Sequence, residues 1–176
     1  MSLRHALLGL VAERPASGYD LLKTFETSLA HVWPATQSQV YGELGRLGDV
    51  GLLTVAAQGP RGRKEYTITD EGLAELRHWL LSTAPERPAR SDMLLRVFFL
   101  GRVAADEAAD YLARQGEAAA ARLAGFEELS DSIDWGQDPL SVYGKVALEY
   151  GRRISAAQRE WADWAAAQVR AGERGQ

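Results

Sequence analysis

The spacing of apolar and polar positions between residues 33 and 70 predicts a short amphipathic helix. At 100° per residue, one set of positions falls within roughly 40° of arc, and it comprises Val40, Leu44, Leu47 and Gly51. The opposite side carries Ser38, Gly42, Gly45 and Asp49. We therefore expect one face of this helix to be buried and the other to remain free.

Start and stop residues flank the same helix. Proline is tolerated in a first turn, as Pro34 would be, and the hydroxyl of Thr36 or Ser38 can accept a hydrogen bond from an orphan amide. The run Asp49-Val50-Gly51 ends the pattern. Two β-prone runs follow at residues 53–56 and 66–69, and the glycine-rich stretch 58–64 separates them. We interpret them as a hairpin with a flexible, cationic tip.

The rest of the chain is predicted to be helical. Helices are expected at residues 3–12, 18–29, 70–81, 93–100, 106–129 and about 139–169. Within 70–81, one side carries Leu73, Leu76, Leu80 and Leu81, and within 106–129 one face carries Leu112, Ala119, Leu123 and Phe126. Pro85 and Pro88 mark residues 84–91 as a linker. The fold class is thus mainly α with a small β-hairpin, divided into domains 1–83 and 92–176.

The last helix carries a seam that indicates helix packing. Apolar or small residues alternate spacings of three and four, at Leu140, Tyr143, Ala147, Tyr150, Ile154, Ala157, Trp161 and Trp164. Bulky and small residues alternate along this seam. We therefore expect it to pack against its own chain and a partner subunit together, as a dimerisation surface.

Composition and charge narrow the class of protein. Hydrophobic residues make up 46% and charged residues 25% of the chain, as in ordinary globular proteins. The absence of cysteine fits a cytoplasmic location, and no segment approaches the ~18 apolar residues of a membrane span. The net charge of −4 argues against a protein that coats nucleic acid generally. Any DNA-binding surface must therefore concentrate its positive charge locally.

A helix followed by a cationic hairpin suits duplex DNA. The helix can enter the major groove while basic side chains neutralise neighbouring phosphates. We predict DNA contacts from Gln37, Ser38, Gln39, Tyr41, Gly42, Arg46, Arg61, Arg63 and Lys64. Glu43 and Asp49 depart from this expectation because carboxylates repel phosphate. The simpler alternatives are that Ser38 caps the helix, that Tyr41 packs against the hairpin and that the cations form a solvated loop tip.

Four motifs resemble a known family. They are GYDLL at residues 18–22, S-Q-V-Y-x-x-L-x-x-L at 38–47, GLL at 51–53 and GRKEYTITDEG at 62–72. Together they resemble the PadR family of bacterial winged-helix transcriptional regulators, and the helical second half resembles the branch with a longer dimerising domain. The resemblance implies a homodimer on a palindromic DNA operator, most often as a repressor, with no cofactor.

The resemblance also implies that DNA binding responds to a signal. Such regulators commonly release DNA when an aromatic or hydrophobic small molecule changes the dimer geometry, and Tyr150, Trp161 and Trp164 are the residues we expect to line an effector pocket. In this family the β-hairpin is called the wing. The change in dimer geometry would act by altering the distance between the wings of the two subunits. Core or interface packing is the alternative role for these aromatic side chains.

Other functions fit the sequence less well. His5, His31 and His78 are widely separated, and no metal-binding or nucleophile motif occurs, so neither a catalytic nor a metal site is expected. Residues 59–62 match the GXXG of RNA-binding KH domains, but β-prone runs flank them where KH domains have helices. A winged helix that serves only for protein interaction has the same fold pattern. Salt-sensitive duplex binding would discriminate that alternative.

Overall fold

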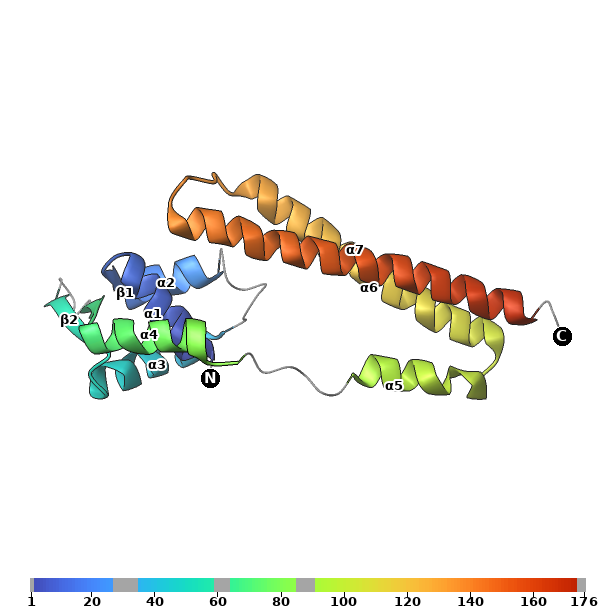
Figure 1. Ribbon diagram of the computed structural model, residues 1–176, viewed down its shortest axis with the longest axis horizontal. Coiled ribbons are helices and arrows are strands. Elements are labelled where there is room, and N and C mark those ends of the chain that lie inside the picture. The colour runs from blue at the N-terminus through green and yellow to red at the C-terminus, as the bar shows by residue number, and fades with distance from the viewer. Residues whose placement is uncertain (1, 27–34, 59–63, 85–90, 174–176) are drawn as a thin grey trace. The chain divides into compact units, whose positions relative to one another are not determined.

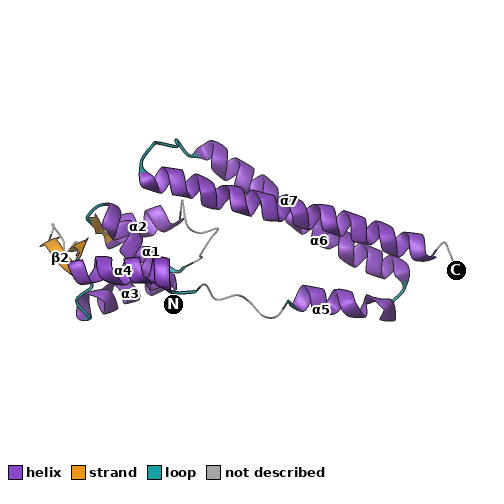
Figure 2. Ribbon diagram, in the orientation of Figure 1, coloured by secondary structure: helices purple, strands orange, loops and turns teal. Residues whose placement is uncertain are grey.

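The computed structural model describes residues 2–26, 35–58, 64–84 and 91–173 of the chain. These form two compact units, Met1–Glu86 and Arg87–Gln176. Helices dominate both units, and all described strands lie in the first (Figures 1 and 2). No helix within the described ranges combines the length and apolarity needed to cross a membrane.

The first unit combines helices with one small antiparallel sheet. Its elements are α1 (Ser2–Glu13), β1 (Ala16–Ser17), α2 (Gly18–Thr24), α3 (Gln37–Asp49), β2 (Leu53–Gln58), β3 (Lys64–Ile68) and α4 (Asp70–Ser82). The strand order is β1-β3-β2, so β3 is the central strand. The hairpin of β2 and β3 was predicted, whereas the two-residue β1 was not. The predicted end of the second helix, at residues 27–29, lies outside the described residues.

The core of this unit confirms the predicted apolar face of α3. Val40, Leu44 and Leu47 are fully buried. They join a cluster that also contains Leu7, Leu8, Leu10, Val11, Ala16, Leu21, Phe25 and Leu53. Burial of aliphatic side chains of this size stabilises a fold by about 1.5–3 kcal/mol each. The opposite face of α3 is held outward as a result.

Side-chain and backbone caps define both ends of α3. Thr36 Oγ1 accepts a hydrogen bond from Gln39 N at 3.3 Å, and Gln39 Oε1 accepts one from Thr36 N at 2.9 Å, which is a capping box. At the other end, Leu52 N donates to Leu47 O, and Gly51 has φ +75°. This is the Schellman arrangement, in which glycine adopts a left-handed conformation. The placement of Gly51 on the buried helix face was therefore wrong, because the helix ends at Asp49.

The hairpin differs from its prediction at both strand ends. β2 extends to Gln58, and β3 begins at Lys64, opposite Gln58. Thr69 was predicted to lie in the second strand, but it caps α4 instead. Its Oγ1 accepts a hydrogen bond from Gly72 N at 3.0 Å and donates to Gly51 O at 2.8 Å. The turn after α3 is therefore tied directly to the start of α4.

The leucine side of α4 is mostly exposed. Leu73, Leu80 and Leu81 face solvent, whereas Leu76 packs against the core. Contact with the rest of the unit runs through Gly72, which is buried, and through Glu75 and Trp79 near His5 of α1.

The second unit is a pair of long helices with a shorter helix before them. Its elements are α5 (Asp92–Phe99), a 3₁₀ turn η3 (Leu100–Arg102), α6 (Ala105–Ser132) and α7 (Pro139–Glu173). The helices α6 and α7 pack along each other (Figure 1). Leu112 and Ala119 are buried on the predicted face of α6.

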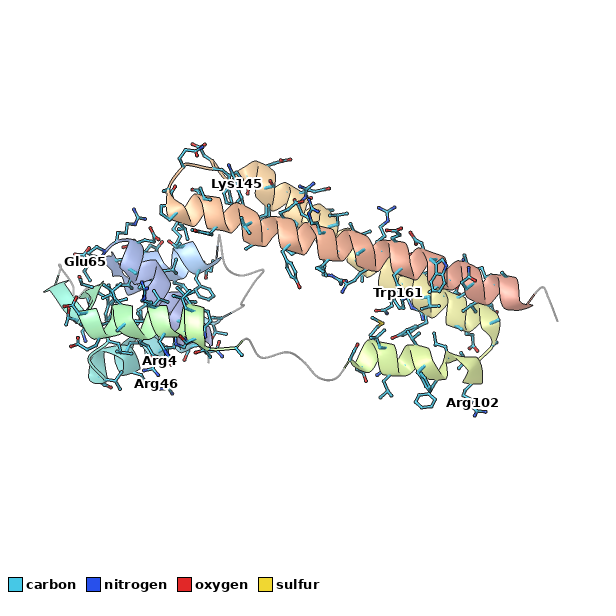
Figure 3. All side chains as sticks on the ribbon, viewed as in Figure 1. Arg4, Arg46, Glu65, Arg102, Lys145 and Trp161 are labelled. Carbon is cyan, nitrogen blue, oxygen red and sulfur yellow. The ribbon has the colours of Figure 1, made fainter. Side chains whose placement is uncertain are left out.

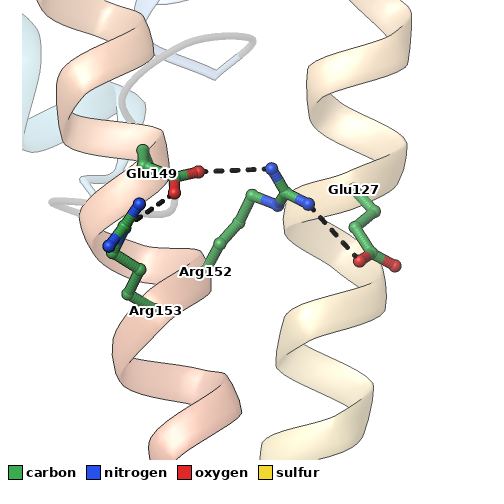
Figure 4. Close-up of polar contacts among 4 residues, drawn as sticks. All are labelled: Glu127, Glu149, Arg152 and Arg153. Atoms are coloured by element: carbon green, nitrogen blue, oxygen red, sulfur yellow. Dashed lines mark hydrogen bonds and ion pairs between the residues drawn. The ribbon is translucent and has the colours of Figure 1, made fainter.

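Small residues of α7 face α6 and the loop that follows α6. A Cβ at Gly151 would lie 2.6 Å from the ring of Phe126, and one at Gly144 would lie 3.0 Å from the ring of Trp135. Arg152 of α7 joins the two helices, with Nη1 at 3.2 Å from Glu149 Oε2 and Nη2 at 3.7 Å from Glu127 Oε1 (Figure 4). These exposed ion pairs contribute little stability. The close approach therefore depends on glycine and alanine.

The predicted seam of α7 does not pack against its own chain as expected. Tyr143, Tyr150, Ile154 and Trp164 are exposed, and only Trp161 packs against the buried cluster of this unit. The residues that α7 buries are Ser155, Ala162, Ala165 and Ala166. A long helix can carry packing positions on two sides, and a three-four spacing does not reveal which side its own chain covers.

Candidate nucleic-acid interface

The exposed face of α3 includes two glycines at which the helix backbone is bare. Gly42 and Gly45 are exposed, and a Cβ added at either would meet no atom within 4 Å. Ser38, predicted beside them, is exposed as well. Glycine inside a helix costs about 1 kcal/mol relative to alanine. Two such residues on an open face leave room for another molecule to approach the helix backbone closely.

The first turn of α3 presents amide and hydroxyl groups. Gln37, Ser38 and Gln39 are all exposed. Thr36 is the N-cap, so the alternative that Ser38 caps the helix was wrong. The side-chain carbonyl of Gln39 is occupied by the capping box, which leaves its NH₂ group as a donor. These groups can offer hydrogen bonds to a polyanion or to base edges.

Tyr41 lies between the second helix and the wing. Its ring packs over Gly18 at the start of α2, where an added Cβ would lie 2.5 Å from Cε1. The side chain is nevertheless 41% exposed. Burial raises the pKa of Tyr66 on β3, and the Tyr41 phenol adds to that rise. Tyr41 therefore has a packing role while part of its side chain remains available for contact.

Arg46 projects from the same helix (Figure 3). Its Nη1 lies 3.1 Å from Glu43 Oε2, one helical turn earlier. The sequence suggested that Glu43 would repel phosphate, but it did not predict this ion pair. The guanidinium is thus held by a neighbouring carboxylate.

The wing contributes one described cation. Lys64 is exposed at the start of β3. Arg61 and Arg63 lie outside the described residues, so their predicted contacts remain predictions. The hairpin follows α3 through the Gly51 turn and is tied to α4 by Thr69. Helix α3 and the wing are therefore parts of one packed unit.

The two described histidines, His5 and His78, lie in different environments. His5 is buried, with Nε2 at 3.2 Å from Glu75 Oε1, and its ring stacks on Trp79 at a centroid distance of 4.5 Å. His78 is exposed on α4. Within the described ranges, no group of three His, Asp or Glu side chains could hold a metal ion. His31 lies outside those ranges.

The second unit exposes apolar side chains that the sequence analysis did not assign to a site. On α5 these are Leu94, Leu95, Phe98 and Phe99, and Phe98 is 83% exposed. An eight-residue run that is apolar around most of its circumference was the available signal, because such a helix normally requires burial on more than one side. The exposed apolar residues of α5, like the exposed seam of α7, are suited to contact with a partner.

A cavity of about 580 Å³ lies between η3, α6 and the end of α7. Val97, Leu100, Leu112, Trp164, Gln168 and Val169 are among its lining residues. Of the residues predicted for an effector pocket, Trp164 lines the cavity, and Trp161 packs against the adjacent buried cluster. Tyr150 lies almost four turns away along α7 and does not line it.

The order of α2, α3, a β-hairpin and α4, with β1 completing the sheet, defines a winged helix-turn-helix protein. Residues 7–78 match the Transcriptional regulator PadR-like family, and residues 89–170 match Virulence activator alpha C-term. The Negative transcriptional regulator PadR of Bacillus subtilis is 32% identical over 162 residues, covering 90% of this chain and 89% of that protein. The chain belongs to the PadR-like family and is a DNA-binding transcriptional regulator.

Solved structures agree with this assignment. Bacillus subtilis PadR in complex with operator DNA matches with a TM-score of 0.79 and 27% identity, over 96% of this chain and 99% of that one. The same protein in complex with p-coumaric acid matches with a TM-score of 0.83 and 26% identity, over 96% and 99% of the two chains. The family consists of transcriptional regulators rather than enzymes.

Proposed function

We propose that this chain is a dimeric repressor that reads a two-fold symmetric operator with α3 and the wing. The observation that carries the proposal is the open, glycine-containing face of α3 beside the cationic hairpin. The similarity to a negative regulator and to a PadR structure in complex with operator DNA supports it. Residues 1–83 then form the reader, residues 84–91 the linker and residues 92–176 the dimerisation region. The protein acts in the cytoplasm, where its operator is accessible.

The DNA-contacting groups divide by role. Gln37, Ser38, Gln39, Tyr41, Gly42 and Arg46 approach the major groove from α3, and Arg61, Arg63 and Lys64 contact phosphates from the wing. Contacts to phosphates contribute affinity without sequence preference, whereas contacts to base edges discriminate between DNA sequences. The wing is therefore expected to dominate the salt dependence of binding.

Replacing Arg61, Arg63 and Lys64 together with alanine tests this assignment. Up to three phosphate contacts would disappear, so the slope of log affinity against log salt should fall in magnitude by up to about 2.7. A matched variant that replaces Arg102, Arg114 and Arg159 changes the net charge equally on the second unit and should retain the slope. Binding that is weak and insensitive to salt in the wild type would favour a protein-interaction module instead.

Dimerisation is assigned to the second unit. The exposed seam of α7 provides Leu140, Tyr143, Ala147, Tyr150, Ile154, Ala157 and Trp164, with Trp161 at its edge, and α5 adds four exposed apolar side chains. Large apolar patches on a single chain commonly mark interfaces. A two-fold dimer would present two readers to two half-sites.

A small-molecule effector is the second part of the proposal. The cavity beside Trp164 has the size and mainly apolar lining of a ligand site, with Gln168 as a polar group. The PadR structure with p-coumaric acid makes that compound the natural first probe. Titration should quench tryptophan fluorescence and release operator DNA, and Trp164→Phe should reduce the quenching, whereas Trp135→Phe should not. Release of DNA with unchanged Trp164 fluorescence would place the effector elsewhere.

A further inference from the structure

We propose that Glu43 is a specificity-determining residue that restrains Arg46 and thereby lowers the affinity of the protein for DNA other than its operator. The inference rests on the proposed function, since it concerns discrimination by the same helix. It is carried by the ion pair between Arg46 Nη1 and Glu43 Oε2, at 3.1 Å.

The charge balance of α3 makes this pair important. The helix carries a single guanidinium, at Arg46, and two carboxylates, at Glu43 and Asp49. Its own charge therefore repels phosphate. Affinity for any duplex rises with the number of phosphates that cations neutralise. Whether Arg46 is free or paired thus changes the binding that this helix offers to every sequence.

The two partners are unequally exposed. The Arg46 side chain is 79% exposed, whereas that of Glu43 is 18% exposed. The carboxylate is therefore held at the flank of the helix, and the guanidinium is the partner that can leave. A phosphate that takes Arg46 leaves the Glu43 carboxylate unpaired beside a polyanion. This arrangement is electrostatically unfavourable.

A base pair can compensate for this cost, whereas a phosphate cannot. Arginine can make two hydrogen bonds to guanine O6 and N7, and a carboxylate can accept one from the N4 amine of cytosine. A phosphate engages only Arg46. The open backbone at Gly42 and Gly45 allows the close approach that base contacts need. Glu43 therefore penalises backbone contacts more than base contacts, which is specificity by exclusion.

The test compares Glu43→Gln with Asp49→Asn in the full-length protein. Both variants remove one negative charge from α3, but among the described residues only Glu43 pairs with Arg46. Affinity is measured for an operator selected by the wild type and for a scrambled duplex of equal length, across a salt series. Glu43→Gln should bind the scrambled duplex about two- to fivefold more tightly than Asp49→Asn does, the range open to an exposed ion pair. Its salt slope should steepen by about 0.9, and the specificity ratio should fall.

Arg46→Ala provides a background in which the proposed difference must vanish. There, Glu43→Gln and Asp49→Asn should have equal effects, because the coupling requires both partners. If the two variants gain equally on both duplexes while Arg46 is present, Glu43 has no such role and DNA binding still stands. If the wild type shows no salt-sensitive binding to any duplex, the proposed function itself fails.

Discussion

At the residue scale, glycine has three distinct roles in the first unit. Gly51 adopts φ +75° and ends α3, so its freedom of backbone conformation is required. Gly72 is needed for space, because an added Cβ would clash with Leu52 O and lie 2.8 Å from Ile68 Cγ1. Gly42 has neither a positive φ nor a neighbouring atom that a Cβ would meet in the isolated chain. Its absence of a side chain is therefore best explained by an external surface.

Alanine substitutions should separate these roles. Gly72→Ala is expected to lower the free energy of unfolding by about 1–3 kcal/mol, because the backbone of Leu52 must move. Gly42→Ala should raise it by about 1 kcal/mol, since the added methyl group favours the helix and meets no atom. Chemical denaturation measures both. The same Gly42→Ala protein should bind its operator more weakly, and unchanged binding would show that no close approach occurs there.

At the scale of elements, the apolar periodicity predicted the buried face correctly for a helix that packs on one side only. The apolar face of α3 was predicted correctly because its residues pack into a single core. The seam of α7 was assigned partly to its own chain, and among its residues only Trp161 packs against the buried cluster of this unit. There the own-chain contact uses Gly151, Ser155 and Ala162, whose small side chains give little hydrophobic signal. α5 also received no predicted role, although its apolar run Leu94, Leu95, Phe98 and Phe99 is visible in the sequence.

Phe98→Asp tests the role of α5. The side chain is 83% exposed, so the substitution should leave the fold of one chain intact. A charge buried in a subunit interface should raise the dimer dissociation constant by tenfold or more. Sedimentation measured over a range of concentrations gives this constant. Gln137→Asp adds the same charge in the exposed turn before α7, and it should leave the dimer unaffected. Equal behaviour of the two variants would remove α5 from the interface.

At the scale of the whole molecule, the two compact units carry different surfaces. The first carries the open face of α3 and the wing, and the second carries the exposed apolar surface and the cavity. A repressor of this design responds to a signal only if the effector binds two arrangements of the dimer with different affinity. A change in the distance between wings would then weaken operator binding.

Half-site spacing should expose the two-fold symmetry. Selection from a random duplex library should enrich a palindrome with half-sites about 10–10.5 base pairs apart, or a multiple of that distance. Inserting five base pairs between the half-sites places them on opposite sides of the duplex, and affinity should fall to that of a single half-site. Retained affinity in a gel-shift titration would mean that the two readers are not held at a fixed spacing.

The sequence by itself determined the order of the α-helices, the buried face of α3 and the β-hairpin that follows it. Each depends on local chemistry or on a period that one buried face imposes. The tertiary structure decided that Thr36 caps α3, that Thr69 leaves the strand to cap α4, and that Glu43 holds Arg46. It also decided which side of α7 its own chain covers. These features depend on which groups meet in space, and a pattern of residue types along the chain does not specify its partners.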